Sequence, residues 1–400
     1  MGDNNKRSPK SKRRLIAVLA IVVVLIGWAV YEVFLSTNAT IRRAEAFLFR
    51  RMTVVQLEEG HYRYFFVSNR KIEPGDDPIE DRVTTEHSGK IAFGSYDIRL
   101  SPLLGLGGLL NWSDFLQTEQ IRLTETRLHE RDDFIDTLRR YVEASPGRSL
   151  LIMVHGFRET FPLALRRTAF FASVLDANTP VLVFDWPADQ GGMLRGYQAS
   201  RVLATESAKE LAQALELIVR EIAPDRLAIL GNSMGAQVVV DAFTLLHDNP
   251  DLADVDTEFS QVVLTAPDVS RNLFSQQFKH EIADLADHLT VYVSSNDRAL
   301  IVSRLVNREA RAGESTIGPD QYAETLELAQ LIEPDNDQIA LVDVTPVNRT
   351  RNFHNFYVES PEFFDDLYLR LTTDDPPQSR RIHPVVAPDE RVYWVLTSGR

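Results

Sequence analysis

Short apolar runs alternate with amphipathic stretches from about residue 133 to residue 371. Apolar runs of this kind predict buried strands, here at residues 149–155, 181–185, 227–230, 262–265, 290–294 and 339–344. The amphipathic stretches predict helices, at residues 134–142, 163–175, 204–222, 237–243, 278–289 and 367–371. Strands that alternate with helices predict an α/β fold, in which a mostly parallel sheet carries helices on both faces.

The flanking regions follow different patterns. Two aromatic or apolar stretches, at 62–67 and 90–100, predict further strands, and a loop is expected at 74–78. The charged stretch 36–60 predicts a helical segment. The tail after residue 373 is polar and rich in proline, so we expect a loose extension.

The longest apolar run lies near the N-terminus. Residues 15–31 carry no charge, and after Glu32 the run resumes to Leu35, a length that suffices to span a bilayer. Residues 1–14 hold six Lys or Arg against one Asp, about +5, and such a cluster stays in the cytoplasm. The pattern predicts a signal anchor at 15–35 in the inner (plasma) membrane, with the rest of the chain periplasmic or extracytoplasmic. A cleaved signal peptide and a buried helix are the alternatives.

Charge and composition narrow the partners and the chemistry. The chain carries −14 overall, so residues 15–400 carry about −19, a poor match for nucleic acid or anionic lipid. Cysteine is missing from the sequence, which excludes disulfides, thiol nucleophiles and cysteine metal sites. Because no metal-binding histidine motif and no glycine-rich nucleotide motif occurs, we expect neither a metal nor another cofactor. The oligomeric state stays open.

One five-residue window carries specific chemistry. Gly231-Asn232-Ser233-Met234-Gly235 fits G-x-S-x-G, the nucleophile elbow of α/β hydrolases. A predicted strand precedes it and a predicted helix follows it, which is the context that this motif requires. Glycine suits both ends of the motif because side chains there would crowd the neighbouring strand and helix. The alternative is an ordinary turn in which the serine caps the helix.

A serine hydroxyl needs a base that a third group holds in place, and in this fold the order along the chain is Ser, acid, His. Asp297 follows the strand 290–294 and is the predicted acid, with Asp268 as the alternative. His354 follows the last predicted strand and is the predicted base. Asp343 and Glu359 are less suitable residues for orienting that histidine.

Acyl transfer also needs donors for the developing oxyanion, worth about 3–4 kcal/mol each. The predicted donors are the backbone N–H groups of Met234 and Phe157, and Gly156 lets the backbone approach closely. His155 is expected to hold this loop rather than to move protons. Asp185, which ends another strand, is expected to have a structural role.

Six short motifs together resemble a family of mostly bacterial α/β hydrolases classed as a domain of unknown function. The motifs are residues 154–157 (VHGF), 184–187 (FDWP), 231–235 (GNSMG), 266–268 (APD), 292–300 (YVSSNDRAL) and 311–313 (RAG). The resemblance spans about residues 60–370. It implies the α/β-hydrolase fold and a triad of Ser233, Asp297 and His354. Asn232 departs from the family pattern, which commonly has histidine at that position, and this departure can change the polarity of the pocket.

These features divide the chain into five predicted segments. They are a basic cytoplasmic tail (1–14), the transmembrane anchor (15–35), a juxtamembrane segment with the first strands of the hydrolase domain (36–130), the catalytic core (131–372) and a proline-rich extension (373–400).

The predicted function is that of a membrane-anchored serine hydrolase of the esterase, lipase or thioesterase type. It would cleave a small-molecule or lipid ester through an acyl-enzyme. An acyltransferase with the same triad is an alternative, since sequence does not separate transfer to water from transfer to an alcohol or amine. A non-catalytic envelope protein that uses the scaffold for binding is a further one.

Overall fold

The computed structural model describes only part of the chain. The described residues are 56–58, 61–100, 121–175, 177–192, 194–249, 259–270, 274, 278–294, 338–348, 356–373, 382–386 and 392–397. The predicted membrane anchor at 15–35, the predicted acid Asp297 and the predicted base His354 lie outside them. Within the described ranges, no helix is both long and apolar enough to cross a membrane.

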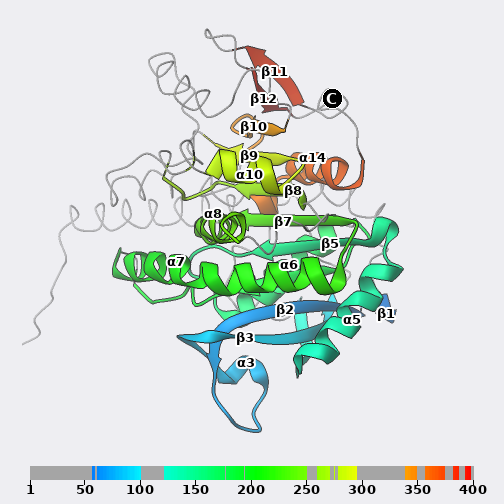
Figure 1. Ribbon diagram of the computed structural model, residues 1–400, viewed down its shortest axis with the longest axis vertical. Helices are drawn as coiled ribbons and strands as arrows, with labels where there is room; N and C mark the ends of the chain where they lie inside the picture. The colour runs from blue at the N-terminus through cyan, green and yellow to red at the C-terminus, as the bar shows by residue number, and fades with distance from the viewer. Residues whose placement is uncertain are drawn as a thin grey trace, which may run out of the picture.

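The described strands form a single 12-stranded sheet. Their order is β11-β12-β10-β9-β8-β7-β5-β6-β2-β3-β4, with β1 paired to β2, and Figure 1 shows them stacked from β3 near the bottom to β11 at the top. The strands are β1 (Gln56–Glu58), β2 (His61–Ile72), β3 (Val83–Leu100), β4 (Ile121–His129), β5 (Ser149–Val154), β6 (Val181–Asp185), β7 (Arg226–Asn232), β8 (Phe259–Thr265), β9 (Leu289–Val293), β10 (Ile339–Asp343), β11 (Ile382–Val386) and β12 (Val392–Leu396).

The middle of the sheet is parallel and its margins are antiparallel. β2, β6, β5, β7, β8, β9, β10 and β12 run in the same direction. β3 and β4 continue the sheet antiparallel on one side, and β11 does so on the other. This confirms the predicted mostly parallel sheet and its six central strands. Their apolar runs are buried on both faces, as parallel strands require.

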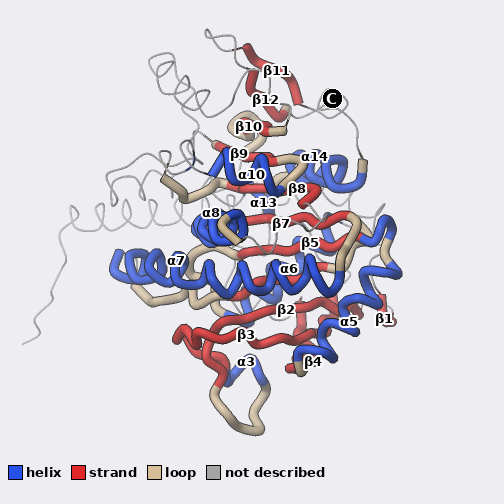
Figure 2. The backbone as a smooth tube through the Cα atoms, in the orientation of Figure 1, coloured by secondary structure: helices blue, strands red, loops and turns tan. Residues whose placement is uncertain are grey.

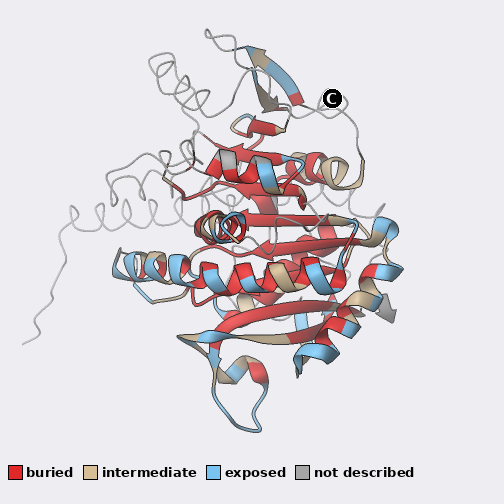
Figure 3. Cartoon of the chain, in the orientation of Figure 1, coloured by how far each residue is buried: buried red, intermediate tan, exposed pale blue. Residues whose placement is uncertain are grey.

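Helices cover both faces of the sheet (Figure 2). Side chains alternate between the two faces along each strand, so Leu150 and Ile152 of β5 join one apolar core while Leu151 and Met153 join the other. The first core includes residues of α5 (Arg131–Ala144), α7 (Leu194–Leu217), α8 (Met234–His247) and α10 (Lys279–Leu285). The second includes residues of α6 (Phe161–Leu175), α13 (Phe356–Glu359) and α14 (Pro361–Thr372). Figure 3 shows the buried strands between helices whose outer sides are exposed.

The structure corrects the predictions for the two margins. Part of the stretch 36–60, expected to be helical, is strand β1. The tail after residue 373 is not wholly loose, because β11 and β12 form a hairpin whose second strand pairs with β10. Pro384 is tolerated in β11 because an edge strand needs hydrogen bonds on one side only.

Several elements differ in length from the prediction. The helix predicted at 278–289 is shorter, because α10 ends at Leu285 and β9 begins at Leu289, whereas two strands and one helix are longer. β2 and β3 pair over most of their lengths, beyond the apolar stretches that predicted them, and carry the short helix α3 (Ile79–Arg82) between them. α7 begins ten residues before the predicted start at residue 204 and continues into a π-helical turn at Ile218–Ile222.

Candidate active site

The strand order places a topological switch point beside β5. After β5 the chain adds β6 on one side of it, and then returns to add β7 on its other side. Where the direction of winding reverses in an open α/β sheet, ligands bind outside the carboxyl ends of the strands. The loops that follow β5 and β7 flank this switch point. They contain Gly156 and Ser233, both in the predicted site.

Ser233 occupies the sharp turn between β7 and α8. Its backbone has φ +52° and ψ −120°, a conformation that a non-glycine residue adopts only under strain. Three hydrogen bonds hold it there. The Ser233 N–H donates to Thr265 O (2.9 Å), and Ser233 O accepts from the N–H groups of Ala236 and Asp268 (3.1 Å each). Such strain costs on the order of 1–3 kcal/mol and persists only where the surroundings enforce it.

The glycines around Ser233 have steric reasons. A Cβ on Gly235 would lie 2.4 Å from both Val154 O and His155 O, so the start of α8 packs directly on the end of β5. A Cβ on Gly231 would lie 3.0 Å from atoms of Ala236 and Val239, on the same helix. These contacts explain why a side chain is excluded at either end of the motif.

The loop after β5 lies directly beside the serine. A Cβ on Gly156 would be 3.2 Å from the Cβ of Ser233 and 3.0 Å from the Asn232 side-chain nitrogen. The Asn232 side chain is itself fixed, because the Thr265 hydroxyl donates to its oxygen (3.0 Å). Ser233, 8% exposed, therefore lies between the Gly156 backbone and the first residues of α8, whose N-terminus favours negative charge.

The predicted oxyanion donors come from these same two segments. Met234 is the first residue of α8 and is buried. Phe157 follows Gly156, and its ring packs edge-on against Tyr197 of α7, with centroids 5.6 Å apart. The Tyr197 hydroxyl in turn donates to the Asp268 carboxylate (2.6 Å). The Asp268 N–H also donates to Ser233 O. Phe157, Tyr197 and Asp268 are therefore linked to the serine by successive contacts.

His155 and Asp185 lie at the base of the loop. The His155 Nδ1 lies 3.1 Å from Gly156 O, and its Nε2 lies 3.2 Å from Asp185 Oδ1 and 3.2 Å from the Trp186 backbone nitrogen. The Trp186 indole N–H donates to His155 O (2.9 Å), and the two rings stack. Both side-chain nitrogens of His155 are thus directed at loop and strand atoms of the protein.

Asp185 is fully buried and remains ionised. Burial acts to raise the pKa of its carboxyl group, but the Arg70 charge and hydrogen bonds from His155 and Ser68 hold that pKa below its usual value. The Ser68 hydroxyl donates to Oδ2 at 2.7 Å, and the Arg70 Nε lies 3.0 Å from the same oxygen.

The other two members of the predicted triad are not placed. Asp297 and His354 fall outside the described residues. The strands that they follow in sequence, β9 and β10, both run parallel to β7 and end at its edge of the sheet. Asp343, at the end of β10, is buried, and burial raises the pKa of its carboxyl group despite hydrogen bonds from Thr345.

Three residues near the site escaped the sequence analysis. Arg70 lies with Ser68, Asn69 and Lys71 in the polar run that follows the apolar part of β2, and this interruption is a signal that could have marked it. Glu159, buried at the end of the loop after β5, and Tyr197, on a long helix, have no such signal. Their roles depend on contacts between segments that are distant in sequence.

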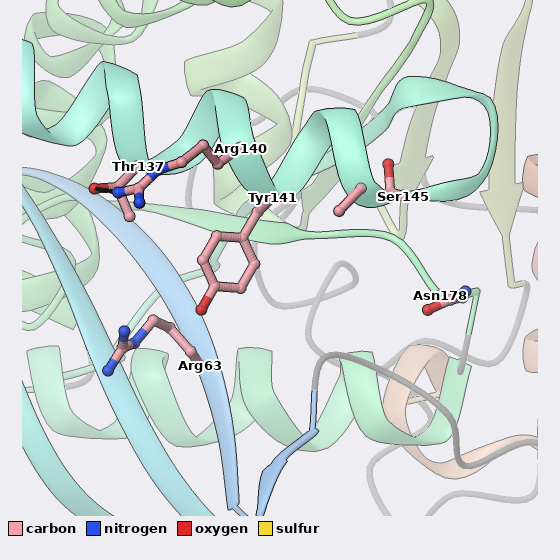
Figure 4. Close-up of a pocket in the computed structure, with 7 residues that line it drawn as sticks. Arg63, Thr137, Arg140, Tyr141, Ser145 and Asn178 are labelled. Atoms are coloured by element: carbon pink, nitrogen blue, oxygen red, sulfur yellow. Dashed lines mark hydrogen bonds between the residues drawn. The ribbon is translucent and has the colours of Figure 1, made fainter.

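A cavity of about 480 Å³ lies elsewhere (Figure 4). It is lined by residues at or before the amino ends of β2, β5 and β6, and so lies at the opposite edge of the sheet. Its lining is Arg63, Thr137, Arg140, Tyr141, Ala144, Ser145 and Asn178, with no predicted site residue among them. In the described part of the chain no cluster of acidic and histidine side chains could hold a metal ion.

Comparison with known proteins places the chain in a family. A family model described as an alpha/beta hydrolase of unknown function (DUF900) matches residues 130–370. A structure assigned as a cell surface hydrolase from Lactobacillus plantarum WCFS1 is similar, with 13% identity and a TM-score of 0.29, over 57% of this chain and 94% of that one. A second structure, assigned as a hydrolase from Agrobacterium vitis S4, has 11% identity and a TM-score of 0.32, over 74% of this chain and 96% of that one. TM-scores this low say nothing about the function of this chain. No curated protein matches its sequence.

Proposed function

This chain belongs to the α/β hydrolases of unknown function, and we propose that it is a membrane-anchored serine hydrolase that cleaves carboxylic esters. The observation that carries the proposal is the geometry of Ser233. A serine in a strained turn, between a buried strand and a helix N-terminus, has the backbone geometry that a nucleophile elbow requires. The loop after β5 lies against this serine, since a Cβ on Gly156 would be 3.2 Å from the Cβ of Ser233, and this closeness supports the proposed oxyanion loop.

The proposed reaction proceeds through an acyl-enzyme. The Ser233 hydroxyl attacks the ester carbonyl while His354 takes its proton, and Asp297 orients His354. The negative oxygen of the tetrahedral intermediate accepts hydrogen bonds from the Phe157 and Met234 N–H groups. The C–O bond then breaks, and His354 returns the proton to the leaving alcohol. Water repeats the sequence, which releases the acid and restores the serine.

Anchoring rests on the sequence of residues 15–35 alone. An apolar run of this length behind a basic cluster favours a single span with the hydrolase domain on the extracytoplasmic side. Such a domain would meet ester substrates at the outer face of a membrane. Fractionation tests this part, because an anchored protein stays in the membrane pellet at high salt and is released by detergent. Recovery of the full-length chain in the soluble fraction would refute anchoring without affecting the chemistry.

A fluorophosphonate probe tests the serine chemistry. We expect the probe to label the wild-type protein and not Ser233→Ala, because the probe needs an activated serine. Ser260→Ala is the matched control, since the Ser260 hydroxyl bonds to Leu227 O at the opposite end of β7. Labelling should persist in this control. Labelling that survives in Ser233→Ala, or a wild type that neither labels nor hydrolyses p-nitrophenyl esters, would contradict the proposal.

Paired aspartate variants identify the acid. Asp297→Asn should reduce kcat by about 10⁴-fold, as loss of the orienting carboxylate does in serine proteases. Asp268→Asn keeps an acceptor for the Tyr197 hydroxyl and should have a much smaller effect. The reverse order of effects would assign the acid to Asp268.

A further inference from the structure

Arg70 is a buried cation at the same edge of the sheet as Ser233. It comes from β2, which precedes the residues that the family model matches. Its side chain is 1% exposed and makes contacts in three directions. Nε donates to both oxygens of Asp185 (3.0 and 3.1 Å), one terminal nitrogen to Asp189 Oδ1 (2.6 Å), and the other to Glu159 O (2.7 Å).

These partners lie at the carboxyl end of β6 and in the loops that follow β5 and β6. Glu159 ends the loop that begins at His155, and His155 contacts Asp185, the principal partner of Arg70. The loop 155–159 is therefore tied at both ends to the same ion pair. Phe157, whose N–H is the proposed oxyanion donor, lies between the two attachment points.

A second connection extends the network. The Glu159 carboxylate accepts from Arg167 of α6 (2.9 Å), and Arg167 also interacts with the Tyr357 side chain of α13. Tyr357 is three residues after His354, the proposed base. The end of the oxyanion loop thus contacts, through one arginine, the helix that follows the proposed base.

Arginine has the geometry that this position demands. A planar guanidinium directs its N–H groups along several fixed directions, whereas a lysine ammonium is a point charge on a flexible stem. Buried ion pairs contribute little net stability compared with apolar packing of the same volume. The consequence of burying this charge is therefore geometric: it fixes two loops against one strand.

We propose that Arg70 is a positioning residue that holds the loop 155–159 so that the Phe157 N–H points at the oxyanion. The inference rests on the serine-hydrolase function proposed above. It makes the β2–β3 hairpin a functional part of the site rather than an addition to the hydrolase core.

The test compares Arg70→Met and Arg70→Lys with Arg63→Met in the full-length protein. Arg63 is the matched control, because it lies on the same strand and pairs with Asp97, but at the far edge of the sheet. We expect kcat for a p-nitrophenyl ester to fall about 100-fold in Arg70→Met, the effect of displacing one oxyanion donor, with KM within about threefold. Arg70→Lys should recover less than about tenfold of this loss, and Arg63→Met should stay within about twofold of wild type.

Two further measurements make the outcome decisive. Deuterium uptake of residues 155–160 should rise in both Arg70 variants and stay unchanged in Arg63→Met. This measurement needs no substrate, so it does not depend on the choice of ester. Urea unfolding identifies a variant that fails to fold, and Arg70→Lys then serves in place of Arg70→Met. Unchanged uptake, an unchanged kcat or a change in KM alone would overturn the role of Arg70. A wild type without labelling or turnover would instead overturn the proposed function, while the uptake measurement still tests whether Arg70 orders the loop.

Discussion

The two edges of the sheet differ in what they offer a substrate. The amino edge carries the cavity of about 480 Å³, whose lining includes Arg63 and Tyr141. The carboxyl edge around Ser233 is filled with buried polar side chains whose positions are fixed by hydrogen bonds. Catalysis depends on groups that are oriented before the substrate arrives, so the tightly bonded edge is the better candidate.

The largest expected effect is on kcat, and it should differ between variants at the two edges of the sheet. His354→Ala should lower kcat by about 10⁴-fold to 10⁶-fold, because a triad acts as a unit. Tyr141→Leu, in the cavity, should leave kcat and KM within about twofold of wild type. Steady-state ester hydrolysis measures both. A cavity variant that reduces kcat as strongly as the histidine variant would move the active site to the amino edge.

The next effect concerns the buried charges of the carboxyl edge. Asp185→Asn leaves the Arg70 cation without its principal partner, so the free energy of unfolding at pH 7 should fall by about 3 kcal/mol. Asp97→Asn, which weakens the half-buried Arg63 pair at the other edge, should cost less than about 1 kcal/mol. Urea unfolding of both variants gives the comparison.

The effect of Asp185→Asn should also depend on pH. The pKa of Asp185 in the folded state lies below its ordinary value, so its carboxylate stabilises the fold fully at pH values above about 3.9. This contribution is lost as the pH falls through the lowered pKa. Wild type and variant should therefore converge in stability only in strong acid. A difference that vanishes already at pH 6 would contradict the ionised pair.

Gly235→Ala should lower the free energy of unfolding by a smaller amount. The added Cβ would meet two backbone carbonyl oxygens at 2.4 Å, and backbone cannot move aside as a side chain can. Overpacking of this kind costs about 1–3 kcal/mol. Because the elbow would also shift, probe labelling of Ser233 should slow. Normal stability together with normal labelling would show that α8 does not pack on β5 as described.

The smallest expected effect is a gain in stability when Asp343 is replaced. Asp343 is buried, Thr345 donates to its Oδ1, and its Oδ2 has no partner among the described residues. Since burial raises its pKa, the ionised carboxylate destabilises the fold increasingly as the pH rises above about 3.9. Asp343→Asn should raise the free energy of unfolding at pH 7 by about 1 kcal/mol or less, with no gain near pH 3. A loss at pH 7 would show that this carboxylate has an ionic partner.

Much of the carboxyl edge could be predicted because its signals are local. The apolar runs give the central strands, and the G-x-S-x-G spacing places Ser233 in a strand–turn–helix context without any knowledge of the fold. Gly156 and Phe157 could be proposed as the oxyanion loop from the sequence, because such a loop follows a strand at a known place in this fold. The margins were harder, since the pairing of β12 with β10 depends on strands separated by about fifty residues.

The sequence by itself determined the alternation of strands and helices and the turn that holds Ser233, because hydrophobic periodicity and the spacing of the G-x-S-x-G motif are properties of neighbouring residues. Only the tertiary structure decided which charges share a buried site. A cation such as Arg70 can be buried only where acceptors surround it, and here the closest acceptors come from segments more than eighty residues away. Their convergence is a property of the strand order, in which β2 lies next to β6.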